Sequence, residues 1–308
     1  TILSLQHYKT FMKRFRNFPV NIAVVNRFIK PSDQKHIIHD LKEGNVDILI
    51  GTHRLLSKDI VFKDLGLLVI DEEQRFGVSH KERIKDFKRD VDVLTLTATP
   101  IPRTLEMAMT GIRDMSTIDT PPEDRKEVQA YVVGFDWGLV RDAVTKELAR
   151  GGQVYFVCRR IEQMDALAAG LKRAVPEARV VMAHGQMGEQ EFEAAVTSFV
   201  EREYDILLCT TIVESGIDIP AVNTIIVYEA DKFGLAQLYQ LKGRVGRSRL
   251  RAYAYFTYLG GEVLNETAAK RLEAIREFTQ FGSGMKIAMR DLEIRGAGNM
   301  LGAEQSGH

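Results

Sequence analysis

The sequence predicts an α/β protein with two parallel-sheet domains, the first of them incomplete, followed by a C-terminal helical hairpin. Apolar runs without polar alternation, such as residues 67–70 (LLVI), are typical of parallel strands covered on both faces. Segments with helical spacing of apolar residues alternate with these runs, which indicates strand–helix crossovers. The alternation breaks in the proline-rich, charged stretch 116–128 and then begins again, which predicts a linker there.

Three regions follow from this pattern, with boundaries at 1–122, 123–262 and 263–308. In the first we expect helices at 5–15 and 31–44 and strands at 21–28, 46–52, 65–73 and 91–100. In the second we expect helices at 137–152, 164–176 and 188–203 and strands at 153–160, 178–185, 204–211, 222–230 and 252–258. The third begins with a charged helix, 265–281, and continues as a Gly-rich tail that keeps apolar residues at helical spacing.

The bulk composition does not indicate what kind of partner the protein binds. Among the 308 residues, Lys+Arg and Asp+Glu both number 42, so a nucleic-acid surface would have to come from local clustering of charge. No apolar stretch approaches the length of a membrane span, and no charged-then-apolar leader begins the chain, so we expect a cytoplasmic protein without a membrane partner. Cys158 and Cys209 lie inside apolar runs, as small buried residues in a reducing compartment do.

Carboxylates follow the apolar run 67–70 directly. Ligands of open α/β sheets bind at the carboxyl ends of strands, so Asp71 and Glu72 lie where a cation or nucleotide would be held. Asp71 could hold Mg²⁺, directly or through its waters, and Glu72 could orient and deprotonate an attacking water. Both are therefore candidate metal and catalytic residues. The alternative is a solvated acidic turn after a core strand.

Hydroxyls and arginines follow later strands. Thr97 and Thr99 (TLTATP) could hydrogen-bond the carboxylates, or cap a helix. Thr210 and Thr211, with Gly216 and Asp218, follow the strand 204–211. The stretch QLYQLKGRVGRSR then brings Gln240, Arg244 and Arg247, and the two arginines would share a helical face if that stretch is helical. Two arginines facing a triphosphate stabilise charge on the transferred phosphoryl group; a solvated basic turn is the alternative.

Taken in order, DEEQ, TATP, TTIVESGIDIP and QLKGRVGR resemble motifs II, III, V and VI of superfamily-two helicases and translocases. That resemblance implies two RecA-like domains with ATP bound in the cleft between them. Asp71 and Glu72 would come from the first domain, and Asp218, Arg244 and Arg247 from the second, with Gly216 also near the nucleotide and Gln240 among the catalytic residues.

The resemblance can be narrowed to one family. DEEQRFGVSHKERIK, the stretch 97–128 and the tail 278–308 are similar to the translocase module of bacterial transcription-repair coupling factors (Mfd). RecG shares the RFGV stretch and the C-terminal translocation motif and is the nearest alternative, with fork reversal as its implied activity. The Mfd resemblance implies double-stranded DNA as a partner, and RNA polymerase and excision-repair proteins as partners through regions outside this chain.

One motif of the family is absent. No G-x-x-x-x-G-K-[ST] occurs in the sequence, so the chain is expected to begin after the phosphate-binding loop and its strand. We therefore expect weak ATP binding, negligible hydrolysis, and exposed apolar surface in the first domain, while the second should fold by itself. A protein that lost its loop naturally and binds DNA without catalysis is the other interpretation.

Residues for DNA contact are carried over by the resemblance. Sequence-independent tracking requires donors to phosphates rather than base readers. Such donors follow the strands at Thr52, His53 and Arg54, at Arg159, at His184 and Gln186, and at Thr210 and Thr211, with Thr97 and Thr99 linking ATP to DNA. In the tail, Arg276, Arg290, Arg295 and Gln305 are expected to couple motion of the domains to DNA movement, and Arg290 and Arg295 flank an acidic DLEI that allows internal ion pairs.

Overall fold

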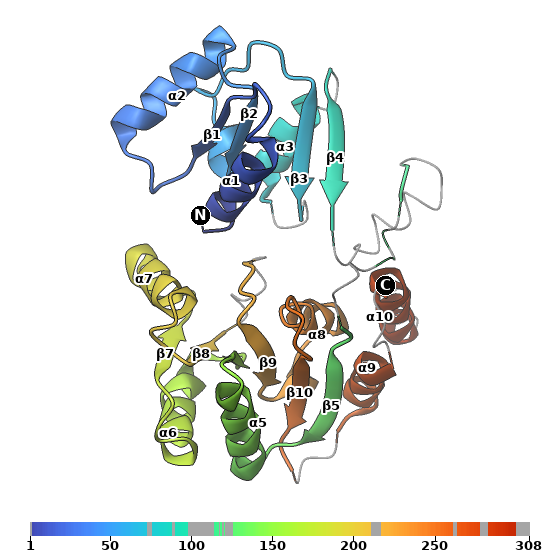
Figure 1. Ribbon diagram of the computed structural model, residues 1–308. Coiled ribbons are helices and arrows are strands. Elements are labelled where there is room, and N and C mark those ends of the chain that lie inside the picture. The colour runs from blue at the N-terminus through green and yellow to red at the C-terminus, as the bar shows by residue number, and fades with distance from the viewer. Residues whose placement is uncertain are drawn as a thin grey trace. The chain divides into compact units, whose positions relative to one another are not determined.

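The computed structural model describes residues 2–72, 76–87, 90–97, 114–116, 118, 120, 126–210, 217–260, 264–277 and 283–299. It contains two compact units, Thr1–Ala98 and Thr99–His308 (Figure 1). The expected boundary between residues 122 and 123 falls outside the described ranges. Among the residues described, no helix has the length and apolar character that crossing a membrane requires.

Unit 1 contains two separate pairs of parallel strands. β1 (Ile22–Val25) pairs with β2 (Ile48–Gly51), and β3 (Leu67–Asp71) pairs with β4 (Asp92–Leu96). The helices are α1 (Ile2–Phe15), α2 (Pro31–Glu43) and α3 (Val78–Phe87), with a short 3-10 helix η1 (His53–Leu56) after β2. α2 starts at a proline and ends at Gly44, whose φ of 83° gives the left-handed C-cap that the sequence predicts.

The expectation that β3 and β4 are covered on both faces is wrong for this unit. Leu67, Val69, Leu94 and Leu96 are 55%, 52%, 50% and 42% exposed, whereas Ile70 on the opposite face is 5% exposed. Side chains alternate along a strand, so these four aliphatic residues share one face of the β3–β4 pair. Apolar surface is thus exposed in unit 1, as expected, because only one face of this pair is packed.

Unit 2 is built on a six-stranded, all-parallel sheet in the order β5-β10-β9-β6-β8-β7. The strands are β5 (Gln129–Gly134), β6 (Gln153–Val157), β7 (Val180–Ala183), β8 (Ile206–Cys209), β9 (Val222–Val227) and β10 (Tyr253–Tyr258). Every expected strand of this region is present. β5 was not expected, because it directly follows the proline-rich stretch.

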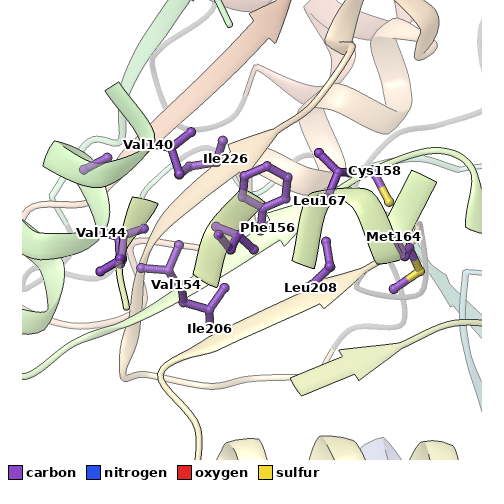
Figure 2. Packing of buried hydrophobic residues seen from close by; sticks show 13 residues of the cluster. Val140, Val144, Val154, Phe156, Cys158, Met164, Leu167, Ile206, Leu208 and Ile226 are labelled. Carbon is purple, nitrogen blue, oxygen red and sulfur yellow. The ribbon is translucent and has the colours of Figure 1, made fainter. Parts of the chain in front are cut away.

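The core of unit 2 lies between the sheet and α5 (Trp137–Ala149) and α6 (Met164–Ala174) (Figure 2). Val140 and Val144 of α5 and Leu167 of α6 meet Phe156 of β6 and Ile226 of β9. Cys158 and Cys209 are buried and free, as predicted. α7 (Glu189–Val200) packs near β7 and β8 on the other side of the sheet, where Phe199 contacts Tyr155.

The C-terminal helices adjoin this unit. α8 (Leu235–Lys242), α9 (Glu266–Glu277) and α10 (Gly284–Asn299) contact one another, and α9 also contacts β5 (Figure 1). The charged helix predicted at 265–281 is α9, and the helical spacing of the tail corresponds to α10. The helical pair expected at the C-terminus is therefore present.

Candidate nucleotide and nucleic-acid site

The acidic end of β3 lies beside the end of β4. Asp71, the last residue of β3, is exposed and pairs in register with Leu96. The backbone N–H of Glu72 donates to the Leu96 carbonyl at 2.9 Å, and the Thr97 hydroxyl donates to Glu72 Oε2 at 3.3 Å. The structure therefore brings together three of the predicted residues, Asp71, Glu72 and Thr97. Thr99 lies outside the described residues.

Glu72 has an unusual backbone conformation. Its φ is 52°, in the left-handed region that non-glycine residues rarely adopt. Such conformations persist where the surrounding structure enforces them, and they concentrate at functional sites. The bend at Glu72 carries its carboxylate toward Thr97, which is consistent with a residue that positions a water.

The oxygen donors at this edge fit a magnesium ion that keeps most of its waters. Two carboxylates and a hydroxyl are the ligand types that Mg²⁺ prefers. In the part of the chain that the structure describes, no group of three or more His, Cys, Asp or Glu could hold a metal. The residues suit an ion shared with a substrate phosphate rather than an all-protein cage.

The arginine stretch of unit 2 is a turn, not a helix. α8 ends at Lys242, and Gly246 has a φ of 77°, so Arg244 and Arg247 do not share a helical face. Arg247 Nη1 lies 3.3 Å from Asp218 Oδ1, and its Nε donates to the Gly243 carbonyl at 3.3 Å. Two of the predicted residues, Asp218 and Arg247, thus form an ion pair.

The other predicted residues of this stretch have less defined positions. Gln240 is half-buried on α8, and Gly216 lies outside the described residues. Tyr155 of β6 lies beneath the arginine turn: burial raises the pKa of its hydroxyl, while the charges of Arg244 and Arg247 oppose that rise.

Three predicted DNA-contacting residues follow neighbouring strands at the carboxyl edge of the unit 2 sheet. β8 lies between β6 and β7, and Val157, Cys209 and Ala183 are register partners. Arg159, Thr210 and His184 follow these strand ends closely; Arg159 is exposed, His184 is half-buried and Thr210 is 7% exposed. Gln186 is exposed in the turn after β7. Thr211 is outside the described residues.

Arg54 of unit 1 already forms an ion pair within the chain. Its guanidinium donates to both carboxylate oxygens of Asp59 at 2.7 and 2.6 Å. This hydrogen bond lowers the pKa of Asp59 and raises that of Arg54. A phosphate would have to share or displace Asp59. Thr52 precedes η1, and the exposed His53 ring lies 5.4 Å from that of His80.

The tail residues are described in part. Arg276 is exposed near the end of α9. Arg290 Nη1 donates to Glu293 Oε2 at 2.9 Å, which is the internal ion pair that the acidic DLEI stretch suggested. The side chain of Arg295 and all of Gln305 lie outside the described residues.

Two polar groups near the site were not predicted. Lys242, the last residue of α8, is 5% exposed, and burial lowers its pKa to about 8 against the opposing effect of Glu127. Glu229 follows β9 with a φ of 51°, is 8% exposed, and accepts a hydrogen bond from Gln163 Nε2 at 2.6 Å. The signal for Glu229 was available, because an acid directly after a buried strand is the pattern that pointed to Asp71.

Comparison with known proteins finds two helicase domain families and relatives that match over the whole chain. Residues 1–108 match the DEAD/DEAH box helicase family, and residues 139–249 match the helicase conserved C-terminal domain. Over 307 residues the chain is 61% identical to the transcription-repair-coupling factor of Bacillus subtilis (strain 168) and 55% identical to that of Staphylococcus aureus (strain USA300). Over its whole length the chain is thus similar to transcription-repair-coupling factors. Each alignment covers 100% of this chain but 26% of the relative.

Solved structures agree with this similarity. RecG bound to a three-way DNA junction aligns with a TM-score of 0.78 and 37% identity, covering 97% of this chain and 40% of that one. Yeast Dbp5 (L327V) bound to RNA and ADP BeF3 aligns with a TM-score of 0.62 and 17% identity, covering 98% of this chain and 78% of that one, and shows the fold alone. The predicted fold class, an α/β protein with two RecA-like parallel-sheet domains, is confirmed, and the described helices α9 and α10 do not conflict with the predicted C-terminal helical hairpin.

Proposed function

We propose that the chain is the motor segment of an ATP-dependent double-stranded DNA translocase that couples transcription to DNA repair by displacing stalled RNA polymerase. The observation that carries this proposal is the placement of Arg159, His184 and Thr210 at one edge of the unit 2 sheet. A basic group, an imidazole and a hydroxyl at strand ends can donate hydrogen bonds to DNA phosphates, and such contacts do not depend on the base sequence. The 61% identity to a transcription-repair-coupling factor supports the specific process.

Each unit contributes chemistry to ATP hydrolysis in this proposal. Glu72 orients and deprotonates the attacking water, with the Thr97 hydroxyl fixing its carboxylate. Arg244 and Arg247 stabilise the charge that develops on the transferred phosphoryl, and Asp218 holds Arg247 in place before ATP binds. Mg²⁺, held through Asp71 and waters, would neutralise charge on the β- and γ-phosphates.

The decisive experiment needs a complete motor. We define the exchange protein as the Bacillus subtilis factor whose matching segment is replaced by these 308 residues. It should show ATPase activity stimulated by duplex DNA and should displace a triplex-forming strand. Glu72→Gln and Arg247→Ala should each lower the ATPase rate by at least about 100-fold. Arg173→Ala, a control on the exposed side of α6, should leave the rate unchanged.

Absence of DNA-stimulated hydrolysis in an exchange protein that melts like the Bacillus subtilis factor would contradict the proposal. The 308-residue chain by itself should bind ATP weakly and hydrolyse it negligibly, because its sequence has no G-x-x-x-x-G-K-[ST] loop. Turnover by that chain comparable to the exchange protein would contradict this part.

The C-terminal helices are proposed to couple hydrolysis to movement. Arg276 and Arg290 are exposed to solvent in part, and Arg290 is held by Glu293. In the exchange protein, Arg295→Ala or Gln305→Ala should spare ATP hydrolysis and abolish displacement of a DNA roadblock. Equal loss of both activities would refute the coupling role. RNA polymerase and excision-repair proteins would be bound by regions outside this chain.

Fork remodelling is the second candidate, because RecG aligns with 97% of this chain at 37% identity. A RecG-like protein would convert a model replication fork to a four-way junction. The exchange protein should release stalled RNA polymerase and leave such forks unchanged. The reverse outcome would favour the fork-remodelling function.

A further inference from the structure

The outer part of the unit 2 sheet has one covered face and one that is only partly covered. β5 and β10 form its edge beside α9 and α10 (Figure 1). Ala254 and Phe256 of β10, both 0% exposed, point to the covered face. Tyr253 and Tyr255 alternate with them and therefore point to the other face. On that other face Tyr255 packs at the margin of the core beneath α5 and α6, and α5 places Lys146 and Arg150 over Tyr253, so among the described residues the coverage ends toward β5.

Three tyrosines line the margin of this coverage, and the outermost, Tyr131, is exposed. Tyr131 of β5 is the register partner of Tyr255, and their rings stack at 5.3 Å with an interplanar angle of 18°. The ring of Tyr255 lies 6.5 Å from that of Tyr253. Tyr131 remains 42% exposed. Two cations of α5 lie over the Tyr253 ring: Lys146 Nζ is 4.8 Å and Arg150 Cζ is 5.1 Å from its centroid.

The two cations differ in their electrostatic state. Arg150 forms an ion pair with the buried carboxylate of Glu147. Lys146 forms no ion pair with any residue in the described ranges, so its ammonium is the unpaired charge beside the rings. We call Tyr131, Tyr253, Tyr255 and Lys146 the tyrosine face. Cross-strand stacking accounts for the pairing of Tyr131 with Tyr255. It does not account for an exposed ring and an unpaired ammonium at one place.

Nucleic acid fits this face poorly. Base stacking requires an open aromatic ring face. Here one face of Tyr131 stacks on Tyr255 and the two cations of α5 lie over Tyr253, so Tyr131 alone is left to offer an open face and the row gives no platform for successive bases. A polypeptide with a carboxylate for Lys146 and an apolar side chain for the edge of the tyrosine row fits better, because aromatic anchors and one charge are typical of protein interfaces.

We propose that the tyrosine face is a docking surface for an acidic segment of the same full-length polypeptide. The occupant follows from charge complementarity to Lys146 and from the length of the family: the chain matches 26% of each relative, so roughly three quarters of such a protein lies outside these 308 residues. The contact would hold unit 2 against another region of the factor.

Two measurements on the exchange protein test the contact. Hydroxyl-radical labelling of Tyr131 should fall at least threefold in the exchange protein relative to the 308-residue chain. A zero-length carbodiimide should join Lys146 to an Asp or Glu outside the 308 residues. Lys146→Arg keeps the charge but removes the reactive amine, so the cross-link should vanish. Lys172→Arg, at an exposed lysine of α6, should leave it intact.

A charge reversal separates docking from local folding. Lys146→Glu should restore labelling of Tyr131 in the exchange protein to the level of the 308-residue chain while the melting temperature of the protein stays within about 2 °C. Equal labelling of Tyr131 in the exchange protein and the 308-residue chain would overturn the proposal. So would a Lys146 cross-link that joins two molecules, detected by mixing ¹⁵N-labelled and unlabelled protein. Neither measurement depends on ATP hydrolysis.

Discussion

Gly246 sets the geometry of the arginine turn, because it lies between Arg244 and Arg247 with a φ of 77°. A Cβ there would lie 2.9 Å from Val128 Cγ2, so alanine meets both an unfavourable backbone and a close contact. We expect Gly246→Ala to lower the free energy of unfolding of unit 2 by about 1–2 kcal/mol, measured in urea. In the exchange protein it should also lower the ATPase rate, because the turn must shift.

Arg202 is the matched control for that substitution. It follows α7 with a φ of 64°, at the position where helices commonly end in a left-handed glycine. Arg202→Gly should therefore raise the free energy of unfolding by about 0.5–1 kcal/mol and leave the ATPase rate unchanged. If Gly246→Ala were as stable as the wild type, the turn would not be constrained as the structure indicates.

The buried Lys242 predicts that the free energy of unfolding depends on pH. Its pKa is lowered from 10.5 to about 8 by burial, so the folded state binds this proton less tightly than the unfolded chain. Below pH 8 the lysine is protonated in both the folded and the unfolded state, so folding carries the full free-energy cost of burying the charged ammonium. Between pH 8 and 10.5 the folded state releases its proton first, and stability rises with pH.

The rise between pH 7 and pH 9.5 should be about 2 kcal/mol. Lys242→Met removes the titrating group, so other groups that titrate in this range cancel in the comparison. Urea unfolding of both proteins at the two pH values measures the difference. Parallel pH profiles for wild type and Lys242→Met would show that Lys242 does not titrate in this window.

At the scale of elements, α5 is fastened to the sheet by one buried carboxylate. Glu147, 1% exposed, accepts hydrogen bonds from the Thr224 hydroxyl at 2.5 Å and from Arg150. A Cβ on Gly152 would lie 1.7 Å from Glu147 Oε1, so the glycine leaves the room that this carboxylate occupies. The start of β6 is thereby fitted to the end of α5.

Removing this carboxylate should be costly. Glu147→Ala leaves Arg150 and Thr224 without their partner and should lower the free energy of unfolding by about 3 kcal/mol. Gly152→Ala alone should cost at least about 2 kcal/mol, but less than about 1 kcal/mol in the Glu147→Ala background, because the clash is gone. Additive effects would contradict the close approach. Asp142→Ala, an exposed carboxylate of the same helix, should change stability by less than about 0.5 kcal/mol.

The same elements show how far the sequence predicts structure. Apolar runs located β6, β8 and β9 because both of their faces are buried. The run in β3 predicted a strand but not its exposure, since coverage depends on what packs against it. β5 (QAYVVG) was missed because it adjoins a proline-rich stretch and, unlike those strands, has only part of its residues buried. Likewise, strand ends predicted which side chains gather at the sheet edge, but the Arg54–Asp59 pair depends on local geometry that composition does not encode.

At the scale of the whole molecule, the two units differ in how well they are packed. Unit 2 is packed on both faces of its sheet, and Phe156, Phe199, Phe233 and Phe256 are at most 1% exposed. Unit 1 has two separate strand pairs and an exposed aliphatic face on β3 and β4. Hydrophobic burial is the main favourable term in folding, so unit 1 should be the less stable of the two.

Calorimetry of the 308-residue chain should therefore show two transitions, with that of unit 1 at the lower temperature.

Leu94→Lys, on the exposed face, should change the stability of unit 1 by less than about 0.5 kcal/mol and reduce self-association. Ile70→Ala, on the packed face of the neighbouring strand, should lower it by about 2–4 kcal/mol. Residues 129–262 alone should unfold cooperatively but below the temperature of the upper transition, because that range contains the sheet with α5, α6 and α7 and lacks α9, which contacts β5. A single transition for the whole chain, shifted as a unit by Ile70→Ala, would mean instead that the two units fold together and that the exposed face of unit 1 is covered in solution.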